Sequence, residues 1–512
     1  MRAPYVEFYN TVHFIMKGML AMLKRIIAAS LAACMMLVSL SACGTTDDNN
    51  ATSDPAQTGA SSETASVASG ASSTATVSGN NNSGAVSGTT GTTSNGGNGG
   101  GATSGGTGSK APNQQTSSTT GTGGNKVLKI WWGNDDESMQ AAVRMYRQSH
   151  PDVVFNIVTP PEYNVEKLKV AISAGTEPNI VSLDHVYITA LGTSGQILDL
   201  NKYGASKIKS KYISSCWNAV TFGSHVYGLP HDGNTIALMY NKDMLQKANQ
   251  SAPKTFNQLL SVGKKVQSYL NNHTGEGEYA FTSPFFAGDS QNRKNWSAFV
   301  YFFWLWRNGG DILNSSNTKA VFNSSAGVNA LNQLKQLVSN NICAGDKYME
   351  PQFYNGTIGM IEMGNWSIPT ITSMSKNADF GVAMMPRLKS GVPQYSGLGL
   401  YALGITKKTT YKQEAFDFIK YYTTNDTFQL QYGKQHNQLP VTKTALNDSY
   451  YSSNIWKLYK KQYALSKARP GVNNWDSIEI QIADAVNNAI KGTSKSADAL
   501  NNAAKKVNTY LK

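Results

Sequence analysis

The segment Lys126-Val-Leu-Lys-Ile-Trp-Trp132 predicts a β-strand, which ends at Gly133-Asn134-Asp135-Asp136. The elements after it keep changing type along the chain: a helix over 138–149, a strand over 153–158, a helix over 165–174 and a strand over 179–183. Strands that alternate with helices pair in parallel and are covered by those helices. The stretch therefore predicts an α/β layer structure, and it sets the fold class for the rest of the chain.

Polar residues follow two of these predicted strands directly. Asn134 and Asp135 come after the first strand, and Asp184 and Tyr187 come after the third. In open α/β sheets, ligands bind beyond the carboxyl ends of the strands. These side chains are therefore candidates for a ligand site.

The later part of the chain continues the mixture of strands and helices. Residues 228–233, Gly-Leu-Pro-His-Asp-Gly, predict a turn before a strand over 235–240. Amphipathic or capped patterns predict helices over 255–266, 296–306, 326–339, 414–423, 454–465, 478–490 and 497–511.

The N-terminal segment, 1–43, has the pattern of a secretory signal. Lys24-Arg25 precedes an apolar run over 26–40, which is short for a membrane-spanning helix. The run ends in Leu40-Ser41-Ala42-Cys43, which resembles the lipobox of bacterial lipoproteins. We expect cleavage before Cys43 and lipidation of its thiol, with more than one acyl chain for stable anchoring. Residues 1–21 are expected to be an upstream extension, because Met22 would make a conventional start.

Residues 44–125 form a linker of Gly, Ser, Thr, Asn and Ala, which has too few apolar side chains to fold. A flexible chain of this length spans on the order of 50 Å. Such a tether suits a receptor held at the surface of a Gram-positive cell, on the extracytoplasmic face of its membrane. All nine Trp residues lie after the linker, where a large core is expected.

The net charge of +13 lies in the folded part, because signal and linker contribute opposite charges of equal size. The Lys residues do not gather with aromatic residues into a nucleic-acid motif, so we expect a solvated surface and no nucleic-acid partner. Cys216 and Cys343 could form a disulfide or remain buried thiols. The His residues lack metal-ligand spacing, and we expect no metal and no cofactor.

The order of motifs resembles the family 1 extracellular solute-binding proteins, the group that includes maltose-binding protein. The resemblance spans about 126–512 and rests on an ordered set of segments: Gly228–Gly233, Met239–Met244, Pro253–Phe256, Phe353–Met360, Gly364-Asn365-Trp366, Ser396–Leu400, Glu414–Ile419, Gln438–Val441, Ala468–Pro470, Asn474-Trp475 and Ala497–Ala503.

The resemblance implies an α/β, two-lobed, periplasmic-binding-protein-like fold of type II, with a ligand cleft between lobes joined by crossing segments. The lobes would be 126–235 with 398–438 and 236–397 with 439–512, and the crossings 235–237, 396–399 and 439–442. It also implies a monomer that captures a carbohydrate, an oligosaccharide in our expectation, and passes it to the permease subunits of an ABC importer.

A carbohydrate site needs flat aromatic rings for the C–H faces of the sugar and polar groups for its hydroxyls. Buried polar groups reject analogues that leave them unpaired. Trp366 stands in the family's Gly-Asn-Trp position and is the leading aromatic candidate. The full candidate set is Trp366, Asp232, Asp184, Tyr187, Asn134, Asp135, Asp289, Trp296, Arg469 and Trp475.

The folded part lacks the sequence signatures of zinc proteases, P-loop proteins and serine hydrolases. We therefore expect a binding protein and not an enzyme. Three alternatives stay open: a receptor for a sugar phosphate or other polar solute, an anchored glycoside hydrolase with two carboxylates, and an adhesive surface protein.

Overall fold

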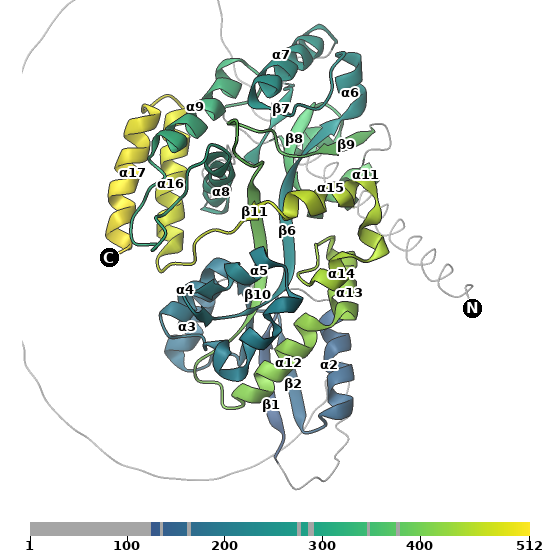
Figure 1. Cartoon of the computed structure of the whole chain (residues 1–512), viewed down its shortest axis with the longest axis vertical. Coiled ribbons are helices and arrows are strands. Elements are labelled where there is room, and N and C mark those ends of the chain that lie inside the picture. The colour runs from purple at the N-terminus through teal and green to yellow at the C-terminus, as the bar shows by residue number, and fades with distance from the viewer. Residues whose placement is uncertain are drawn as a thin grey trace, which may run out of the picture. The chain divides into compact units, whose positions relative to one another are not determined.

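Two long strands, β6 (Leu229–Asn241) and β10 (Ser396–Ile405), run side by side through the centre of the fold in this computed structural model (Figure 1). The structure describes residues 124–133, 137–160, 165–273, 278–284, 291–345, 349–374 and 379–512. The predicted signal sequence with Cys43, and the linker up to residue 123, lie outside the described residues.

The main sheet of the described residues has nine strands, in the order β2-β1-β3-β10-β6-β8-β7, with β11 paired to β10 and β9 paired to β6. β4 (Thr221–Phe222) and β5 (His225–Val226) form a separate pair. The other strands are β1 (Lys126–Trp131), β2 (Val153–Val158), β3 (Ile180–Asp184), β7 (Phe281–Thr282), β8 (Met360–Gly364), β9 (Phe380–Ala383) and β11 (Ser466–Lys467).

The prediction of parallel pairing for the first three strands is confirmed, and the two central strands, for which no direction was predicted, are antiparallel. β1 runs parallel to β2 and β3, whereas β10 runs antiparallel to both β3 and β6. The physical reason is the route of the chain. β6 leaves the first group of strands and β10 returns to it later, so the two strands enter the sheet from opposite ends.

β6 changes its partners halfway along its length. Its residues up to Thr235 pair with β10, and from Ile236 onward they pair with β8 and β9. A third crossing occurs where Gly233 and Leu439 exchange backbone hydrogen bonds of 3.0 and 2.7 Å. The molecule is therefore a two-lobed α/β protein with crossing segments between the lobes. The exact limits of the lobes in the sequence stay a prediction.

The turn predicted at Gly228–Gly233 is wrong, because β6 begins at Leu229 and continues through this segment. Pro230 and Gly233 suggested a turn, but the ladder with β10 accommodates them through a bulge. Asp232 pairs with Tyr401 and Pro230 with the next residue, Ala402, so the register shifts at His231. Bulges of this kind redirect side chains and are common beside functional sites.

The helices cover both lobes. α2, α12 and α13 contact one another beside the β1–β2 end, and α8, α9, α16 and α17 pack together in the other lobe (Figure 1). Short 3₁₀ turns occupy Leu200–Tyr203, Ala205–Lys211, Asn365–Ser367 and Ser449–Ser452. The helices are α2 (Glu137–Ser149), α3 (Val165–Ala174), α4 (His185–Thr193), α5 (Ser214–Ala219), α6 (Lys242–Lys247), α7 (Phe256–His273), α8 (Gln291–Arg307), α9 (Ser325–Ser339), α10 (Glu350–Tyr354), α11 (Ile368–Met374), α12 (Lys412–Thr424), α13 (Asp426–His436), α14 (Lys443–Leu446), α15 (Asn454–Tyr463), α16 (Trp475–Ile490) and α17 (Ser496–Tyr510).

Two hydrophobic cores meet at the second half of β6. Ile236 and Leu238 belong to the core beneath α7, α8 and α16, and Ala237 and Met239 belong to the core that includes α15. This alternation follows from the twofold repeat of a strand, whose successive side chains point to opposite faces. The second half of β6 therefore packs against helices on both faces. This packing holds the first half of the strand, with His231 and Asp232, in place.

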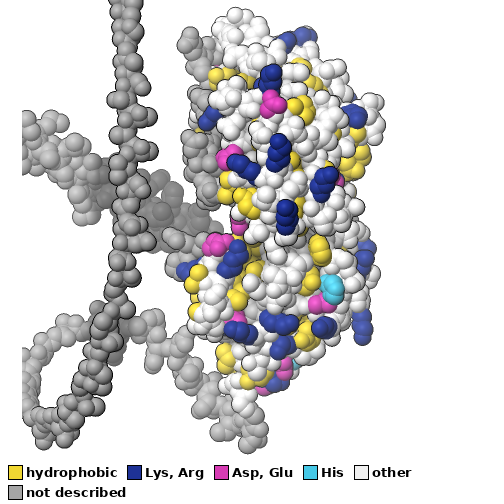
Figure 2. Space-filling view, turned by 90° about the vertical axis from the view of Figure 1, so that its left-hand side faces the viewer, with side chains coloured by type: hydrophobic (Ala, Val, Ile, Leu, Met, Phe, Trp, Pro, Cys, Tyr) yellow, Lys and Arg dark blue, Asp and Glu magenta, His cyan; other side chains and the backbone are white. Residues whose placement is uncertain are grey.

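The surface charge and the two cysteines of the folded part can be described briefly. Lys and Arg side chains are scattered over the face in Figure 2, with no single dense cluster. Cys216 and Cys343 are both buried free thiols, which settles the alternative left open by the sequence. Within the described ranges, every helix is too short or too polar to cross a bilayer.

Candidate functional site

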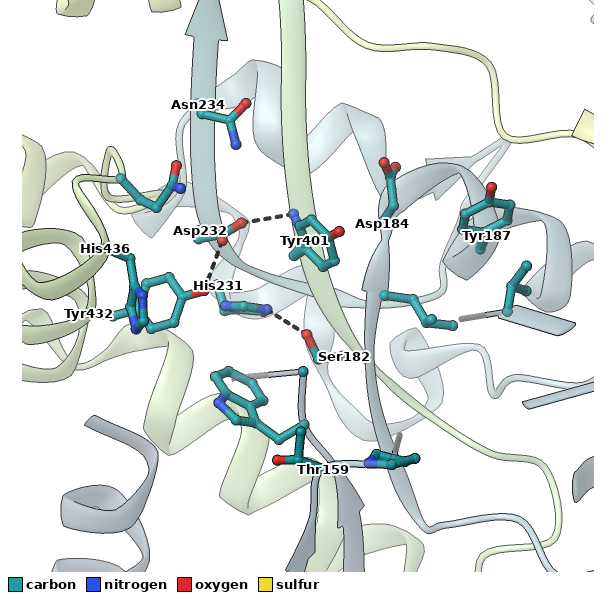
Figure 3. A pocket seen from close by; sticks show the side chains of 16 residues that line it. Thr159, Ser182, Asp184, Tyr187, His231, Asp232, Asn234, Tyr401, Tyr432 and His436 are labelled. Atoms are coloured by element: carbon teal, nitrogen blue, oxygen red, sulfur yellow. Dashed lines mark hydrogen bonds between the residues drawn. The ribbon is translucent and has the colours of Figure 1, made fainter. Parts of the chain in front are cut away.

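Two adjoining cavities lie where β3, β6 and β10 face the second lobe, and together we call them the cleft. The first cavity has a volume of about 740 Å³ and is lined mainly by the first lobe, including Asp184, Tyr187, His231, Asp232 and Tyr401 (Figure 3). The second has about 570 Å³ and adds residues of the second lobe: Trp296, Phe299, Trp366, Arg469 and Glu479. Five residues line both cavities: Asp184, Tyr187, Asn234, Tyr401 and Gln438.

The bulge in β6 brings two adjacent polar side chains, His231 and Asp232, to the same cavity. The Asp232 carboxylate accepts hydrogen bonds from the backbone N–H of Tyr401 at 2.9 Å and from the hydroxyl of Tyr432 at 3.1 Å (Figure 3). Burial raises the pKa of Asp232 to about 7, against the opposing effect of these two hydrogen bonds. The carboxyl group can therefore donate or accept a hydrogen bond near neutral pH.

His231 lines the first cavity beside Asp232. Its Nε2 hydrogen-bonds the Ser182 hydroxyl at 2.8 Å (Figure 3). Its ring lies 4.7 Å from that of Trp132. Burial, with a smaller contribution from nearby His436, lowers the pKa of His231 to about 3. The imidazole is therefore neutral at physiological pH and offers hydrogen bonds without a charge.

Arg469 joins two carboxylates across the cleft. Its guanidinium donates to Asp184, at the end of β3, and to Glu479 on α16 at 3.1 Å. Asp184 also caps α4 by accepting from the backbone N–H of Val186 at 3.2 Å, and it lies 3.0 Å from His185. Asp184 therefore caps the start of α4 and also takes part in the ion pair with Arg469.

The ionisation of these groups follows from their contacts. Burial alone would raise the pKa of Asp184, but the charges of Arg469 and then His185 outweigh it and hold the pKa well below its usual range. For Glu479, burial dominates over Arg469 and raises the pKa to about 7. Burial would lower the pKa of Arg469, but the two neighbouring carboxylates outweigh burial and raise this pKa above its ordinary value. Arg469 thus stays charged and its charge is already compensated.

The aromatic wall of the cleft lies in the second lobe. The Trp296 and Trp366 rings are 6.0 Å apart and inclined by 54°, and Phe299 packs edge-on to Trp296. Trp296 is 36% exposed, and Tyr401 on the opposite lobe is 45% exposed. Large aromatic side chains are usually better buried, and their exposure here leaves flat apolar faces open toward the cavity.

The candidates predicted from the sequence separate into three groups. Asp184, Tyr187, Asp232, Trp296, Trp366 and Arg469 all line the cleft. Trp475 is 2% exposed, packs against Phe302 and borders a different cavity, so it stands apart from the others. Asn134, Asp135 and Asp289 lie outside the described residues.

Several cleft residues were not among the sequence candidates: His231, Asn234, Tyr401, Tyr432, His436, Gln438, Phe299 and Glu479. The sequence could have indicated Glu479, because a carboxylate stands out in the largely apolar helix segment that includes Ile478 and Ile482. Tyr401 and Asn234 gave no such signal, since their exposure depends on the pairing of β6 with β10.

The cleft is built for polar, uncharged recognition. Carboxyl, amide, hydroxyl and imidazole groups alternate with aromatic faces on its walls. Among the residues that the structure describes, no group of three or more His, Cys, Asp and Glu side chains is arranged to hold a metal ion. The chemistry available from these residues is hydrogen bonding and stacking.

Residues 141–458, more than half of the chain, match the model of the bacterial extracellular solute-binding protein family. The chain belongs to this family. Members of the family bind solutes outside the cytoplasm, which agrees with an open cleft between two lobes.

The chain is also similar to individual curated proteins of this kind. A maltotriose-binding protein of Pyrococcus abyssi is 25% identical over 335 residues, which cover 64% of this chain and 68% of that protein. A maltodextrin-binding protein of Bacillus subtilis is 24% identical over 395 residues, covering 73% of this chain and 88% of that protein.

Solved structures show the same fold. The cyclic α-maltosyl-1,6-maltose binding protein of Arthrobacter globiformis superimposes with a TM-score of 0.67 at 23% identity, covering 76% of this chain and 100% of that one. A maltose-bound binding protein of T. maritima gives a TM-score of 0.61 at 22% identity, covering 75% and 100%. The type II, two-lobed architecture of the solute-binding protein family is thus shared.

Proposed function

We propose that this solute-binding protein captures a neutral carbohydrate, in particular an oligosaccharide, and delivers it to the permease subunits of an ABC importer. The observation that carries the proposal is the pairing of exposed aromatic faces with hydrogen-bonding groups on the two sides of one cleft. Trp296, Trp366 and Tyr401 would pack on sugar rings, and Asp232 and Asn234 would bond hydroxyls. Two relatives are named as binding proteins for maltotriose and maltodextrin, which supports this ligand class.

The charge of the cleft favours neutral sugars over sugar phosphates. Among its described lining residues, Arg469 carries the permanent positive charge, and Asp184 and Glu479 already accept its hydrogen bonds. A phosphate would have to compete with both carboxylates. It would also lie near their negative charge, which disfavours a second anion.

The same contacts favour a binding protein over a glycoside hydrolase. A hydrolase needs one carboxyl group to protonate the leaving oxygen and a second to attack or to activate water. Asp184 is committed to Arg469, and the Asp232 carboxylate accepts two hydrogen bonds from within the protein. Both carboxylates are therefore already engaged by groups of the protein.

Calorimetry with maltose, maltotriose and longer malto-oligosaccharides, followed by chromatography of the mixture, tests the proposal. We expect saturable binding with the sugar recovered intact. Ligand at a hundred times its Kd should stabilise the folded chain by about 2.7 kcal/mol. Appearance of shorter sugars would contradict the proposal, and so would the absence of both binding and thermal stabilisation across a wider panel of neutral sugars.

The lipid anchor is a separate part of the proposal and rests on the sequence. Cys43 follows Leu40-Ser41-Ala42 and precedes a flexible linker, so a lipidated Cys43 would hold the receptor at the outer surface of a Gram-positive membrane as a monomer. Incorporation of labelled palmitate in cells tests this point. Cys43→Ala should abolish the label and release the protein into the medium, and retention of label in the variant would contradict it.

A further inference from the structure

A third cavity, of about 280 Å³, lies next to the cleft and separate from its two cavities. Residues of α3 and α4 line one side of it, and residues Val472–Asp476 line the other. Its polar lining consists of Lys169, Ser194, Gln196, Asn473, Asn474 and Asp476, with Trp475 as an aromatic neighbour. Its amides, hydroxyl and aromatic side chain resemble those of the cleft, and Lys169 and Asp476 add charged groups.

Gln196, which lines this cavity, carries a polar atom without a partner among the described residues. The side-chain oxygen of Gln196 is buried, and the described part of the chain supplies no hydrogen-bond donor to it. Buried acceptors are nearly always paired in folded proteins. Gln196 also lines the cavity, so a rotation of its side chain would present this acceptor to the hydroxyl of a bound ligand.

Tyr187 stands between the cleft and the third cavity. It is the residue that lines all three of these cavities, whereas Asp184 lines only the first two and Asp476 only the third. Its hydroxyl donates to the Asp476 carboxylate at 2.5 Å, which ties α4 of one lobe to α16 of the other. The ring and this bond together form a partition across the space between the lobes.

We propose that Tyr187 sets the maximum length of the oligosaccharide, because its side chain closes the cleft at this end and excludes the third cavity as a further sugar subsite. This inference rests on the proposed function, since it specifies the size of the ligand in the same cleft. In the wild type, the Tyr187 side chain keeps a sugar unit out of the third cavity, and without this side chain the cavity would hold one more unit. A chain without the Tyr187 ring would have one continuous space from the aromatic wall to Gln196.

The test measures how affinity depends on sugar length in the full chain, purified in detergent. The probes are maltose, maltotriose and the longer malto-oligosaccharides, measured one by one by calorimetry. For the wild type, affinity should rise with length and then reach a plateau. For Tyr187→Ala, the plateau should move to a longer sugar, with a gain of roughly tenfold for the additional unit.

Two further variants separate the role of the ring from other effects. Tyr187→Phe loses the bond to Asp476 and keeps the ring, so its plateau should stay at the wild-type length. Ser194→Trp, at the rim of the third cavity, should leave wild-type binding unchanged and should abolish the gain when combined with Tyr187→Ala. If Tyr187→Ala does not fold, Tyr187→Leu retains apolar packing and serves for the same measurement.

The outcomes distinguish this inference from the proposed function. A wild-type chain that binds no member of the series contradicts the function, and the inference falls with it. A wild-type chain that binds, with an unchanged plateau in the Tyr187→Ala or Tyr187→Leu variant, contradicts the inference and leaves the function standing. A gain that persists when Ser194→Trp is added also overturns it, because the extra unit would then lie elsewhere.

Discussion

Arg469 donates a hydrogen bond to the carboxylate of Asp184, a residue 285 positions earlier in the chain and on the other lobe. The same guanidinium donates to Glu479, which is 1% exposed as a side chain, while Arg469 itself is 12% exposed. Three charged groups thus share one partly enclosed position between the lobes. For Asp184 the attraction of its charged neighbours outweighs the cost of burial, whereas for Glu479 burial has the larger effect.

The first prediction concerns the loss of this central cation. Arg469→Met should destabilise the folded chain by about 3–5 kcal/mol, because two carboxylates would remain without their partner. Urea denaturation followed by tryptophan fluorescence measures the effect. Lys467→Met is the matched control, since its ion pair with Asp311 is largely solvent-exposed and should contribute about 1 kcal/mol or less. Equal effects of the two substitutions would show that the Arg469 contacts are not formed.

The second prediction concerns the aromatic faces of the cleft. Trp296→Ala and Tyr401→Ala should each weaken malto-oligosaccharide binding roughly tenfold, because each removes a flat surface from a sugar ring. Both side chains are partly exposed, so the melting temperature should change little. Tyr450→Ala removes an aromatic side chain of similar exposure outside the cleft and should bind normally. Unchanged Kd values in both cleft variants would argue for a different ligand position.

Local patterns predicted the first strands and helices of the folded part well. The strand over 153–158 and the helix over 165–174 have the predicted bounds, because each alternates or repeats its apolar residues without a Pro or Gly inside. Asp184 was found for the same reason, since it ends a buried strand. These features depend on neighbours in the sequence, which a single chain displays directly.

The remainder of the site depends on contacts between distant segments. His231 and Tyr401 were missed because their side chains come together only when β10 pairs alongside the bulge in β6. The Tyr187–Asp476 bond and the Arg469 ion pairs likewise join residues that are far apart in the chain. No local pattern encodes such pairing, so these features required the assembled fold.

The third prediction concerns the charge of the ligand. Maltose or maltotriose should raise the melting temperature, and the corresponding sugar phosphates should not, because Arg469 is already paired with two carboxylates. A thermal-shift comparison at low ionic strength gives the phosphate its best chance, since screening is weakest there. If the sugar phosphate raises the melting temperature and the neutral sugar does not, the proposal of a neutral ligand is wrong.

The last prediction follows from the raised pKa of Asp232, about 7 in the folded chain against an ordinary value of 3.8. Through Asp232 the folded protein binds more protons than the unfolded chain between about pH 4 and pH 7, and this contribution to stability falls as the pH rises through the window. His231, whose pKa burial lowers from 6.5 to about 3, acts in the opposite direction below about pH 6.5. Glu479, also raised to about 7, acts in the same direction as Asp232. Wild-type protein should accordingly have a lower free energy of unfolding at pH 8 than at pH 5.

Asp232→Asn removes the Asp232 part of this dependence. Its amide oxygen can still accept from the backbone N–H of Tyr401, and its amide nitrogen can donate to the Tyr432 hydroxyl, so the local hydrogen bonds are retained. The variant should gain stability over wild type at pH 8 by an amount that largely disappears at pH 5. Asp379→Asn, in an exposed ion pair with Lys242, should show no such pH-dependent gain. If denaturation gives Asp232→Asn the same difference from wild type at both pH values, Asp232 is ionised across the range and its burial does not control its protonation.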